Sequence, residues 1–475
     1  MSGVKIYPEV LSRRKLLKHG LFSGLTVSLA PSLFLGGCGT KEGQEDNTNV
    51  IFISIDTLRA DHLGCYGYER NTSFNIDSFA QQNILFKNCF IHEPCTAPSH
   101  MSMFTGLYPV THGVNRFSVL DESITTLAEV LKSEGYRTLG FVRQCGQLCP
   151  EFGFARGFDV YIEKNHRDFI AELQNKLMAK YLKKNKDEKL FVFIHYYDVH
   201  SDFGRLPYDS PPPYDRMYYP DYAGNFSGGN GEIFASEYLV HLNKNKVSLK
   251  DDDLRYITSM YDGSVTYTDK YLGELFEILK ELELYDKSLI IVTSDHGEEF
   301  QEHGWMLHGN PYFYEELVHV PLIIKLPWAT TGGKIIENLV ESIDFMPTIL
   351  GTLGIKNVPK MQGENFMRII ESPDAKWKYS VFGYSVAEGP RAFLRNRRWK
   401  LVADNIYKEN NFKVFDLSND PAEEFDIMGN PQDVTDELKR ELLGRYVKVE
   451  RHGSLEKVQA TPEQLEILKS LGYVE

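Results

Sequence analysis

Residues 50–56 read Val-Ile-Phe-Ile-Ser-Ile-Asp, a nearly continuous apolar run closed by an acid. Such a run, without polar alternation, is typical of a strand buried on both faces of a parallel sheet. Similar runs follow at residues 140–142, 190–194, 288–293 and 320–325. Helical patterns lie between them, at residues 124–134, 169–184, 254–284 and 343–353. This alternation predicts an α/β fold with a large, mostly parallel sheet sandwiched by helices.

Polar side chains follow three of these predicted strands directly. Asp56 closes the first run, residues 195–200 follow the run at 190–194, and Asp295 and His296 follow the run at 288–293. Ligands of open parallel sheets bind at the carboxyl ends of the strands. The sequence therefore predicts one polar site at this edge of the sheet.

The pattern changes after residue 378, where short alternating segments appear at 379–383, 399–403 and 412–415. They predict a small antiparallel sheet, against which a terminal helix at residues 462–471 would pack. We expect a catalytic domain at residues 49–370 and a C-terminal α+β subdomain at 371–475. Residues 201–232, rich in Pro, Gly, Tyr and Asp, predict a long loop that either lines the substrate entrance or is a solvated excursion.

The first 38 residues have the pattern of an export signal. Residues 12–17 read Ser-Arg-Arg-Lys-Leu-Leu, a twin-arginine pattern, and residues 35–38 read Leu-Gly-Gly-Cys, which resembles a lipobox. The apolar run at 20–37 is barely long enough for a membrane helix and contains Pro31. We therefore expect a bacterial lipoprotein, anchored to a membrane through Cys38 and facing the periplasm or cell surface, with residues 39–48 as a tether.

Charge and cysteine content limit the partners and the chemistry. The chain of 475 residues has a formal net charge of -14, which opposes binding to nucleic acid because that needs clustered Lys and Arg. An anionic substrate must instead be attracted locally, by a metal, a helix N-terminus or histidines. Five cysteines remain after Cys38, so at least one thiol is unpaired even in an oxidising compartment. Cys145 and Cys149 form either a local disulfide or two buried thiols.

Four segments carry the chemical signal, at residues 55–67, 95–109, 198–200 and 294–298, with His308 and Gly309 shortly after the last. Taken in this order and spacing, they resemble the sulfatase family of the alkaline phosphatase superfamily. Residues 314–316, 344–348, 415–421 and 471–473 extend the resemblance over almost the whole chain after the tether. The resemblance implies an alkaline phosphatase-like fold and a metal-dependent hydrolase of sulfate or phosphate esters.

Cleavage of such an ester needs a divalent cation, a nucleophile in line with the leaving group, and a proton donor for the leaving oxygen. Asp56, Asp295 and His296 supply two carboxylates and an imidazole from strand ends that lie side by side in the family's fold. Oxygen ligands with one nitrogen suit manganese, zinc or magnesium, and suit calcium less well. Both residues also have a structural alternative. Asp56 could cap a helix or turn, and His296 could be a buried, hydrogen-bonded imidazole.

The expected nucleophile departs from the family's best-known pattern. Many sulfatases carry Cys-x-Pro-Ser-Arg, whose cysteine becomes formylglycine. Here Thr96 stands two residues before Pro98, His100 takes the place of the arginine, and Cys95 lies one residue too early. We expect Thr96 to be a direct hydroxyl nucleophile and a fourth metal ligand, at the start of a helix whose N–H groups favour an anion. The alternative is that Thr96 only caps this helix.

The resemblance implies further contacts with the ester. His200 and His308 match positions where the family places a histidine and a basic residue against the ester, and Arg143 matches a basic position. Cys145 replaces a histidine of that same segment, and Thr57 stands where many members have a second metal-binding aspartate. His112 and Asn115 are weaker candidates, because a purely structural role explains each of them equally well.

Two other functions remain open from the sequence. Thr96 with Asp56, Asp295 and His296 also resembles the metal-plus-threonine set of phosphoglycerol and phosphoethanolamine transferases of the same superfamily. Such a transferase would modify an envelope glycan or lipid instead of hydrolysing its substrate. The other alternative is an envelope lipoprotein that kept the fold and lost catalysis.

Overall fold

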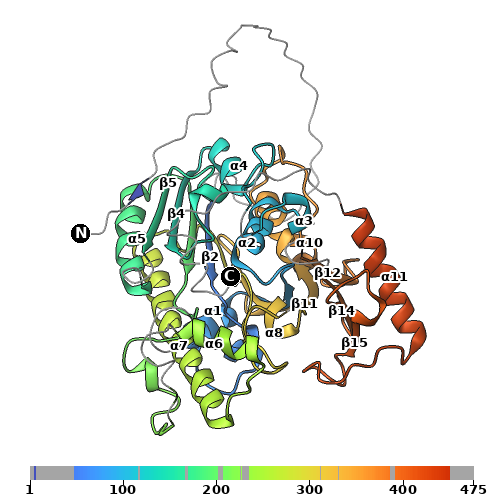
Figure 1. The fold of residues 1–475 in the computed structure, drawn as a ribbon. Coiled ribbons are helices and arrows are strands. Elements are labelled where there is room, and N and C mark those ends of the chain that lie inside the picture. The colour runs from blue at the N-terminus through green and yellow to red at the C-terminus, as the bar shows by residue number, and fades with distance from the viewer. Residues whose placement is uncertain are drawn as a thin grey trace, which may run out of the picture.

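A nine-stranded sheet forms the centre of the protein (Figure 1). The structure is a computed structural model. It describes residues 5–6, 48–115, 118–165, 170–201, 207–224, 226, 235–310, 312–329, 331–385 and 391–449. The strand order is β1-β5-β4-β6-β2-β7-β10-β3-β11. The strands are β1 (Lys5–Ile6), β2 (Asn49–Ile55), β3 (Ile84–Phe90), β4 (Arg137–Gln144), β5 (Val160–Asn165), β6 (Leu190–Tyr196), β7 (Ser288–Thr293), β10 (His319–Lys325) and β11 (Lys334–Glu341).

Most neighbouring strands of this sheet run parallel, which confirms the predicted fold class. The exceptions are β1, which is antiparallel to β5, and β10, which is antiparallel to both β7 and β3. The apolar run at 320–325 is therefore a correctly predicted strand with an unexpected direction. Such a reversal leaves no trace in the sequence, because a strand buried on both faces has the same composition in either direction.

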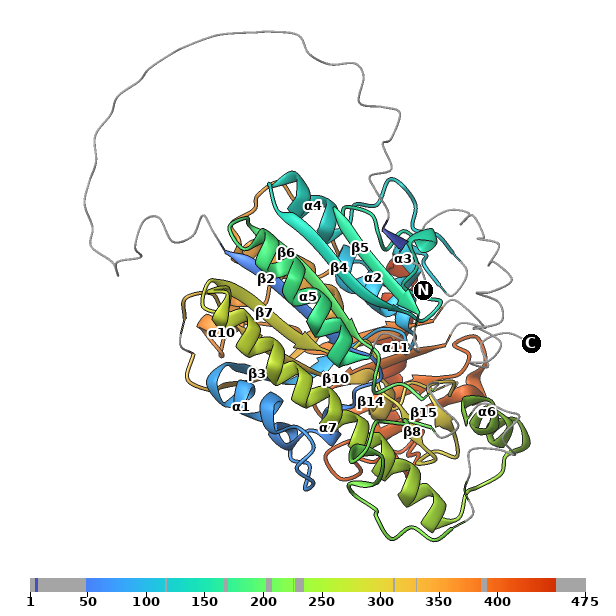
Figure 2. The same ribbon diagram turned by 90° about the vertical axis from the view of Figure 1, so that its left-hand side faces the viewer.

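Helices cover both faces of the sheet, as Figure 2 shows for α5 (Ala171–Asn185) and α7 (Asp251–Glu281) on one face. Ile51, Ile53 and Ile55 of β2 belong to the core on this side. Val50 and Phe52 alternate with them and pack into the opposite core. That core receives the helices α2 (Thr96–Thr105), α4 (Leu127–Ser133) and α9 (Phe345–Thr352). The unbroken apolar run of β2 thus reflects burial on both faces.

The remaining elements are short and connect the layers. They are α1 (Phe74–Gln82), α3 (Pro109–His112), α6 (Ala235–Asn245), α8 (Glu315–Val318), α10 (Met367–Glu371) and the two-stranded sheet of β8 (Glu299–Phe300) and β9 (Met306–Leu307). The sequence did not predict β3, β5 and β11, in which polar residues interrupt the apolar pattern. An outer strand such as β11 tolerates them because part of it is exposed.

The C-terminal region forms the expected small antiparallel sheet beside the large one (Figure 1). Its strands are β12 (Ser380–Tyr384), β13 (Ala392–Asn396), β14 (Trp399–Ala403) and β15 (Phe412–Asp416). Helix α11 (Gln432–Lys448) packs on it through Leu438, Leu442 and Tyr446. The helix predicted at 462–471 lies outside the described residues, and so does the predicted signal at 1–38, apart from Lys5–Ile6, which form β1.

The alternatives for the cysteines can be compared directly with the described residues. Cys65, Cys89, Cys95, Cys145 and Cys149 are all free thiols, so the possible disulfide between the last two is not formed. None of the helices in the described ranges has the length and apolar character needed to cross a membrane.

Candidate metal and ester site

The site lies where β2, β6 and β7 end side by side. Asp56 follows β2 directly, and its backbone N–H donates to the carbonyl of Tyr196 at the end of β6 (2.9 Å). Asp295 and His296 come two and three residues after the last residue of β7. Thr96 is the first residue of α2, which packs against the same edge. The parallel pairing of three adjacent strands therefore brings together residues that are up to 240 positions apart.

Two buried carboxylates lie at the centre of the site without hydrogen-bond donors for most of their oxygens. Both side chains are fully buried. Both oxygens of Asp56, and Oδ2 of Asp295, have no hydrogen-bond partner among the described residues. Burial, together with the neighbouring charge of Asp295, raises the pKa of Asp56 to about 7. Buried, unsatisfied carboxylates are costly unless a cation compensates them.

Burial alone would also raise the pKa of Asp295, but three nearby histidines outweigh it and lower that pKa. They are His296, His100 and His195. Oδ1 of Asp295 accepts hydrogen bonds from the backbone N–H groups of His296 (3.0 Å) and Thr57 (3.3 Å). One oxygen of Asp295 is thus fixed by the backbone, and the other remains directed at the site.

The three distances from His296 to its neighbours are close to those between two ligands of one small metal ion. Its Nε2 lies 3.4 Å from Oγ1 of Thr96, 3.7 Å from Oδ1 of Asp56 and 3.6 Å from Oδ2 of Asp295. An ion with ligand bonds of about 2.0–2.2 Å holds its ligand atoms roughly 3.3–3.6 Å apart in a tetrahedral arrangement. Within the part of the chain that the structure describes, the side chains of Asp56, Asp295 and His296 are one of three groups that could hold a metal ion.

Hydrogen bonds hold His296 and Thr96 in this orientation. Nδ1 of His296 lies 2.9 Å from the carbonyl oxygen of Gly297 and donates to it, which leaves Nε2 as the ligand atom. Ser99 donates to the carbonyl of Asp295 (2.6 Å) and ties α2 to the loop after β7. The Gln147 side chain accepts from the N–H of Ala97 (3.1 Å), so this donor at the helix start is already used.

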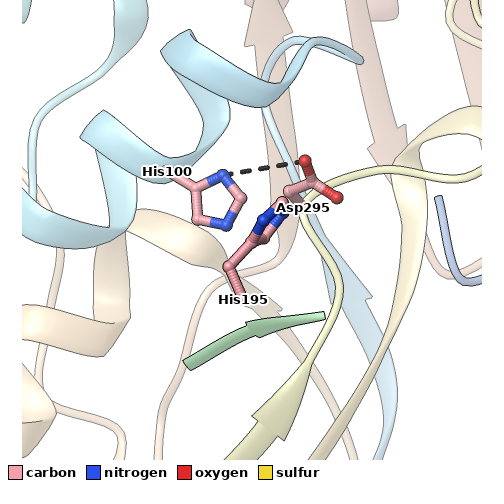
Figure 3. Close-up of side chains that lie close together, drawn as sticks. All are labelled: His100, His195 and Asp295. Atoms are coloured by element: carbon pink, nitrogen blue, oxygen red, sulfur yellow. Dashed lines mark ion pairs between the residues drawn. The ribbon is translucent and has the colours of Figure 1, made fainter. Parts of the chain in front are cut away.

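Figure 3 shows a second group of side chains beside the first, made of His100, His195 and Asp295. Nδ1 of His100 lies 2.8 Å from the carbonyl oxygen of Thr96 and 3.6 Å from Oδ2 of Asp295. Its Nε2 accepts from the hydroxyl of Ser54 (2.9 Å). Since both ring nitrogens are engaged, and burial lowers the pKa of His100 to about 4, this ring is neutral and holds the peptide of Thr96.

The predicted ester-binding residues gather on the other side of His296. The ring of His308 lies 4.4 Å from that of His296 and 5.3 Å from that of His200, measured between ring centroids. All three side chains are buried. Arg143, on β4, pairs with the carboxylate of Asp198 at 3.4 Å. His200 and His308 thus lie side by side next to His296, while Arg143 pairs with the carboxylate two residues before His200.

Both ring nitrogens of the weaker candidate His112 bond to the backbone. Its Nε2 donates to the carbonyl of Pro98 (3.2 Å), and its Nδ1 accepts from the N–H of Val114 (3.0 Å). It therefore supports the turn after α2. Asn115 accepts a hydrogen bond from Ser118 in the same turn (2.9 Å).

Two further residues of the site were not predicted. His195, on β6, has its Nε2 3.2 Å from Oδ2 of Asp56, and it is a polar side chain inside an apolar strand. Glu298 has its Oε1 3.0 Å from Nδ1 of His308, and burial raises the pKa of Glu298 to about 8. The signal for His195 was its place at the start of the polar segment at 195–200, and that for Glu298 was its place in the segment at 294–298.

Comparison with protein-family models identifies the group to which these residues belong. Residues 48–355, more than half of the chain, match the family model described as Sulfatase. The chain belongs to the sulfatase family. A second match, to the model described as N-sulphoglucosamine sulphohydrolase, C-terminal, covers residues 301–448. The sulfatase family is one of sulfuric ester hydrolases, so the predicted enzyme class is confirmed.

Curated relatives from the sulfatase family align over most of the chain. Arylsulfatase K of Mus musculus is 24% identical, over 77% of this chain and 73% of that protein. An N-acetylglucosamine-6-O-sulfatase of Bacteroides thetaiotaomicron is 22% identical, over 86% and 88%. An ulvan-active sulfatase of Formosa agariphila is 25% identical, over 89% and 86%.

Solved structures share the sulfatase-family fold. A protein in complex with its substrate D-glucosamine-2-N,6-O-disulfate gives a TM-score of 0.67 at 19% identity, covering 84% of this chain and 98% of that one. The phosphonate monoester hydrolase of Agrobacterium radiobacter gives a TM-score of 0.66 at 21% identity, covering 85% and 96%. At these identities, the likeness concerns the fold.

Proposed function

We propose that this member of the sulfatase family hydrolyses a sulfate or phosphate ester with Thr96 as the nucleophile, in a centre that holds one divalent cation. The observation that carries the proposal is the convergence of Thr96 Oγ1 with Oδ1 of Asp56 and Oδ2 of Asp295 at 3.4–3.7 Å around Nε2 of His296. Two of these atoms, Oδ1 of Asp56 and Oδ2 of Asp295, are buried carboxylate oxygens without a hydrogen-bond partner among the described residues, and a cation would provide the missing partner.

The ligand set indicates which ion would fit. One imidazole nitrogen with oxygens from Asp56, Asp295 and Thr96 suits manganese, zinc or magnesium, whereas calcium prefers oxygen alone. When bound, such an ion would balance the charges of the two carboxylates and lower the pKa of the threonine hydroxyl.

The other side chains have roles that follow from their places. Thr96 stands at the start of α2, where His100 holds its carbonyl oxygen at 2.8 Å. His200 and His308, beyond His296, are suited to contact the nonbridging and leaving oxygens of the ester. The guanidinium of Arg143 would add a fixed positive charge for the anion, held in place by Asp198.

Substitutions of Thr96 test the nucleophile directly. Thr96→Ala should lower kcat by about 1,000-fold or more, because it removes the attacking atom, and Thr96→Ser should keep part of the activity. A matched control is Thr105→Ala at the other end of α2, where the hydroxyl only donates to the carbonyl of Met101. Activity retained in Thr96→Ala, or a formylglycine mass shift at Cys95, would contradict the proposal.

The substrate class is tested with metal analysis and a panel of sulfate monoesters, phosphate monoesters and phosphodiesters. We expect about one divalent ion per chain and turnover of a sulfate or phosphate monoester. A transferase would instead convert a phospholipid donor to diacylglycerol and a modified acceptor. If metal-replete protein turns over no ester, and Thr96→Ala leaves metal content unchanged, a non-catalytic lipoprotein becomes the better description.

We further propose that the protein is exported through the twin-arginine pattern at residues 12–17 and anchored through Cys38. A folded, metal-loaded enzyme suits a route that carries folded proteins. Cys38→Ser should move the protein from the membrane to the soluble fraction. Intact-mass analysis of the mature protein would detect a lipid on Cys38, and an unprocessed N-terminus would contradict the assignment.

A further inference from the structure

Glu298 and His308 form a buried pair beside the proposed centre. Oε1 of Glu298 lies 3.0 Å from Nδ1 of His308, and the two residues are 0% and 5% exposed. The β8–β9 ladder explains the contact, since Glu299 pairs with Leu307 and the next opposed residues are Glu298 and His308. The short hairpin therefore fixes both partners through its backbone register.

We infer that Glu298 is a positioning residue, which orients His308 so that the histidine gives a proton to the leaving oxygen of the ester. This inference rests on the proposed function. Oε1 of Glu298 engages Nδ1, so the proton for the ester would come from Nε2, on the opposite edge of the ring. The ring itself lies between those of His296 and His200, with centroids 4.4 and 5.3 Å away.

The carboxyl group of Glu298 faces the hydroxyl of Tyr208 and the charge of Arg59, and its measured hydrogen-bond distance is the one to His308. Its Oε2 has no hydrogen-bond partner among the described residues. A buried carboxylate is costly to keep unless its contact serves the fold or the site. The adjacent Glu299, which is equally buried, instead accepts a hydrogen bond from Asn310 (2.8 Å). The two neighbouring glutamates thus have separate partners, and only Glu298 contacts a residue of the site.

The proposed proton transfer balances over two half-reactions. In the first, Oγ1 of Thr96, its proton already lost to solvent, bonds to the sulfur or phosphorus while the bond to the leaving oxygen breaks. The leaving oxygen takes a proton from Nε2 of His308 and departs as an alcohol. In the second, water attacks the esterified Thr96, returns one proton to His308 and one to solvent, and releases the inorganic anion.

Such a donor matters most when the leaving alcohol is a poor leaving group. The pair is therefore suited to esters of unactivated alcohols, such as sugar hydroxyl groups, more than to activated aryl esters. A 4-nitrophenolate departs readily without a proton, whereas a 4-methoxyphenolate gains more from protonation. These aryl esters have similar shapes, so they separate proton donation from binding.

The test compares Glu298→Gln with the wild-type protein on 4-nitrophenyl, phenyl and 4-methoxyphenyl esters of whichever anion, sulfate or phosphate, the wild-type protein releases. We expect kcat/KM to fall by about 10- to 100-fold for the two poorer leaving groups. For the 4-nitrophenyl ester we expect a fall of less than about threefold. A matched control is Glu299→Gln, which should show no dependence on the leaving group.

A double variant separates positioning from damage to the fold. If Glu298 acts through His308, then adding Glu298→Gln to His308→Gln should cause little further loss. An equal loss on all three esters, or additive losses in the double variant, would overturn the inference. Should the wild-type protein turn over none of these esters and no other monoester, the proposed function itself has failed. Circular dichroism and metal content of Glu298→Gln show whether it folds, and if it does not, His308→Gln must show the same leaving-group dependence.

Discussion

Nε2 of His195 lies 3.2 Å from Oδ2 of Asp56, on the opposite carboxylate oxygen from the one that faces His296. The parallel register of β2 and β6, in which Ser54 pairs with His195, creates this contact. Burial lowers the pKa of His195 to about 4, so the ring is neutral. It therefore supports the carboxylate as a neutral polar neighbour, in a contact that falls short of a hydrogen bond, while the other oxygen faces the proposed metal position.

We predict that His195→Gln weakens metal binding by about 10- to 100-fold, because residues that orient a ligand affect affinity on this scale. Activity should recover largely at saturating metal, since the direct ligands remain. Competition with a fluorescent chelator measures the affinity. The matched control is His92→Gln, a buried histidine whose Nδ1 bonds to the carbonyl of Phe382 (2.7 Å), away from the site. Equal metal affinity in both variants would contradict the role of His195.

The sequence predicted which side chains come together where strand ends and motifs coincided. Asp56, Asp295 and His296 were expected at one edge because parallel strands deliver their ends there, and Thr96 because of its place before Pro98. His195 was expected only as the first residue of the polar segment at 195–200, without a role of its own. Its contact depends on the lateral order of β6, β2 and β7, and single-sequence patterns carry no information about which strands are neighbours.

Metal binding should depend on pH through Asp56. Burial and the nearby Asp295 raise its pKa to about 7 in the metal-free protein, so below this pH a cation must displace a proton. The apparent affinity should therefore rise by about tenfold per pH unit between pH 5 and 7 and level off above pH 7. Isothermal titration calorimetry in buffers of different ionisation enthalpy would detect the released proton. An affinity that stays flat across this range would show that Asp56 is already ionised.

The raised pKa of Asp56 also predicts how the stability of the metal-free protein depends on pH. A carboxyl group whose folded-state pKa lies above its unfolded value of about 3.9 favours the folded state at low pH. This contribution is lost as the pH rises through about 7. Urea unfolding after metal removal should therefore show a decline in stability from pH 5 to 8, and added metal should stabilise the protein most at the upper end. A decline that persists equally in Asp56→Asn would assign it to another group.

A buried ion-pair cluster joins the two sheets. Nζ of Lys378 lies 2.5 Å from Glu341, at the end of β11, and 2.6 Å from Asp344. Burial alone would raise the pKa of Glu341, but Lys378 lowers it. We predict that Lys378→Met destabilises the protein by about 3–5 kcal/mol at pH 7, because it leaves two buried carboxylates without their cation.

The loss of stability caused by Lys378→Met should become smaller as the pH falls. The lowered pKa of Glu341 contributes stability above its unfolded value of about 4.3, and this contribution fades as the pH falls. Urea unfolding at pH 7, 4.5 and 3.5 measures the difference. The exposed Lys270→Met, whose partner Glu274 lies 3.9 Å away, is the control and should leave stability unchanged. A pH-independent deficit would point to lost packing instead of lost charge.

Sequence patterns also could not show how closely Gly297 approaches the rest of the chain. A Cβ at this position would lie 1.8 Å from the carbonyl oxygen of Glu316, which no real contact allows without a backbone shift. Gly297 also supplies the carbonyl that holds Nδ1 of His296 at 2.9 Å. Any shift of this residue therefore moves a proposed metal ligand.

We predict that Gly297→Ala destabilises the protein by about 1–3 kcal/mol and lowers its metal content, because the clash is with backbone that cannot rotate away. The control is Gly309→Ala beside His308, where an added Cβ meets no atom within 4 Å. It should keep both stability and metal content. Thermal unfolding and metal analysis of the two variants make the comparison, and a Gly297→Ala protein with full metal content would show that the loop after β7 can adapt while still holding His296 in place.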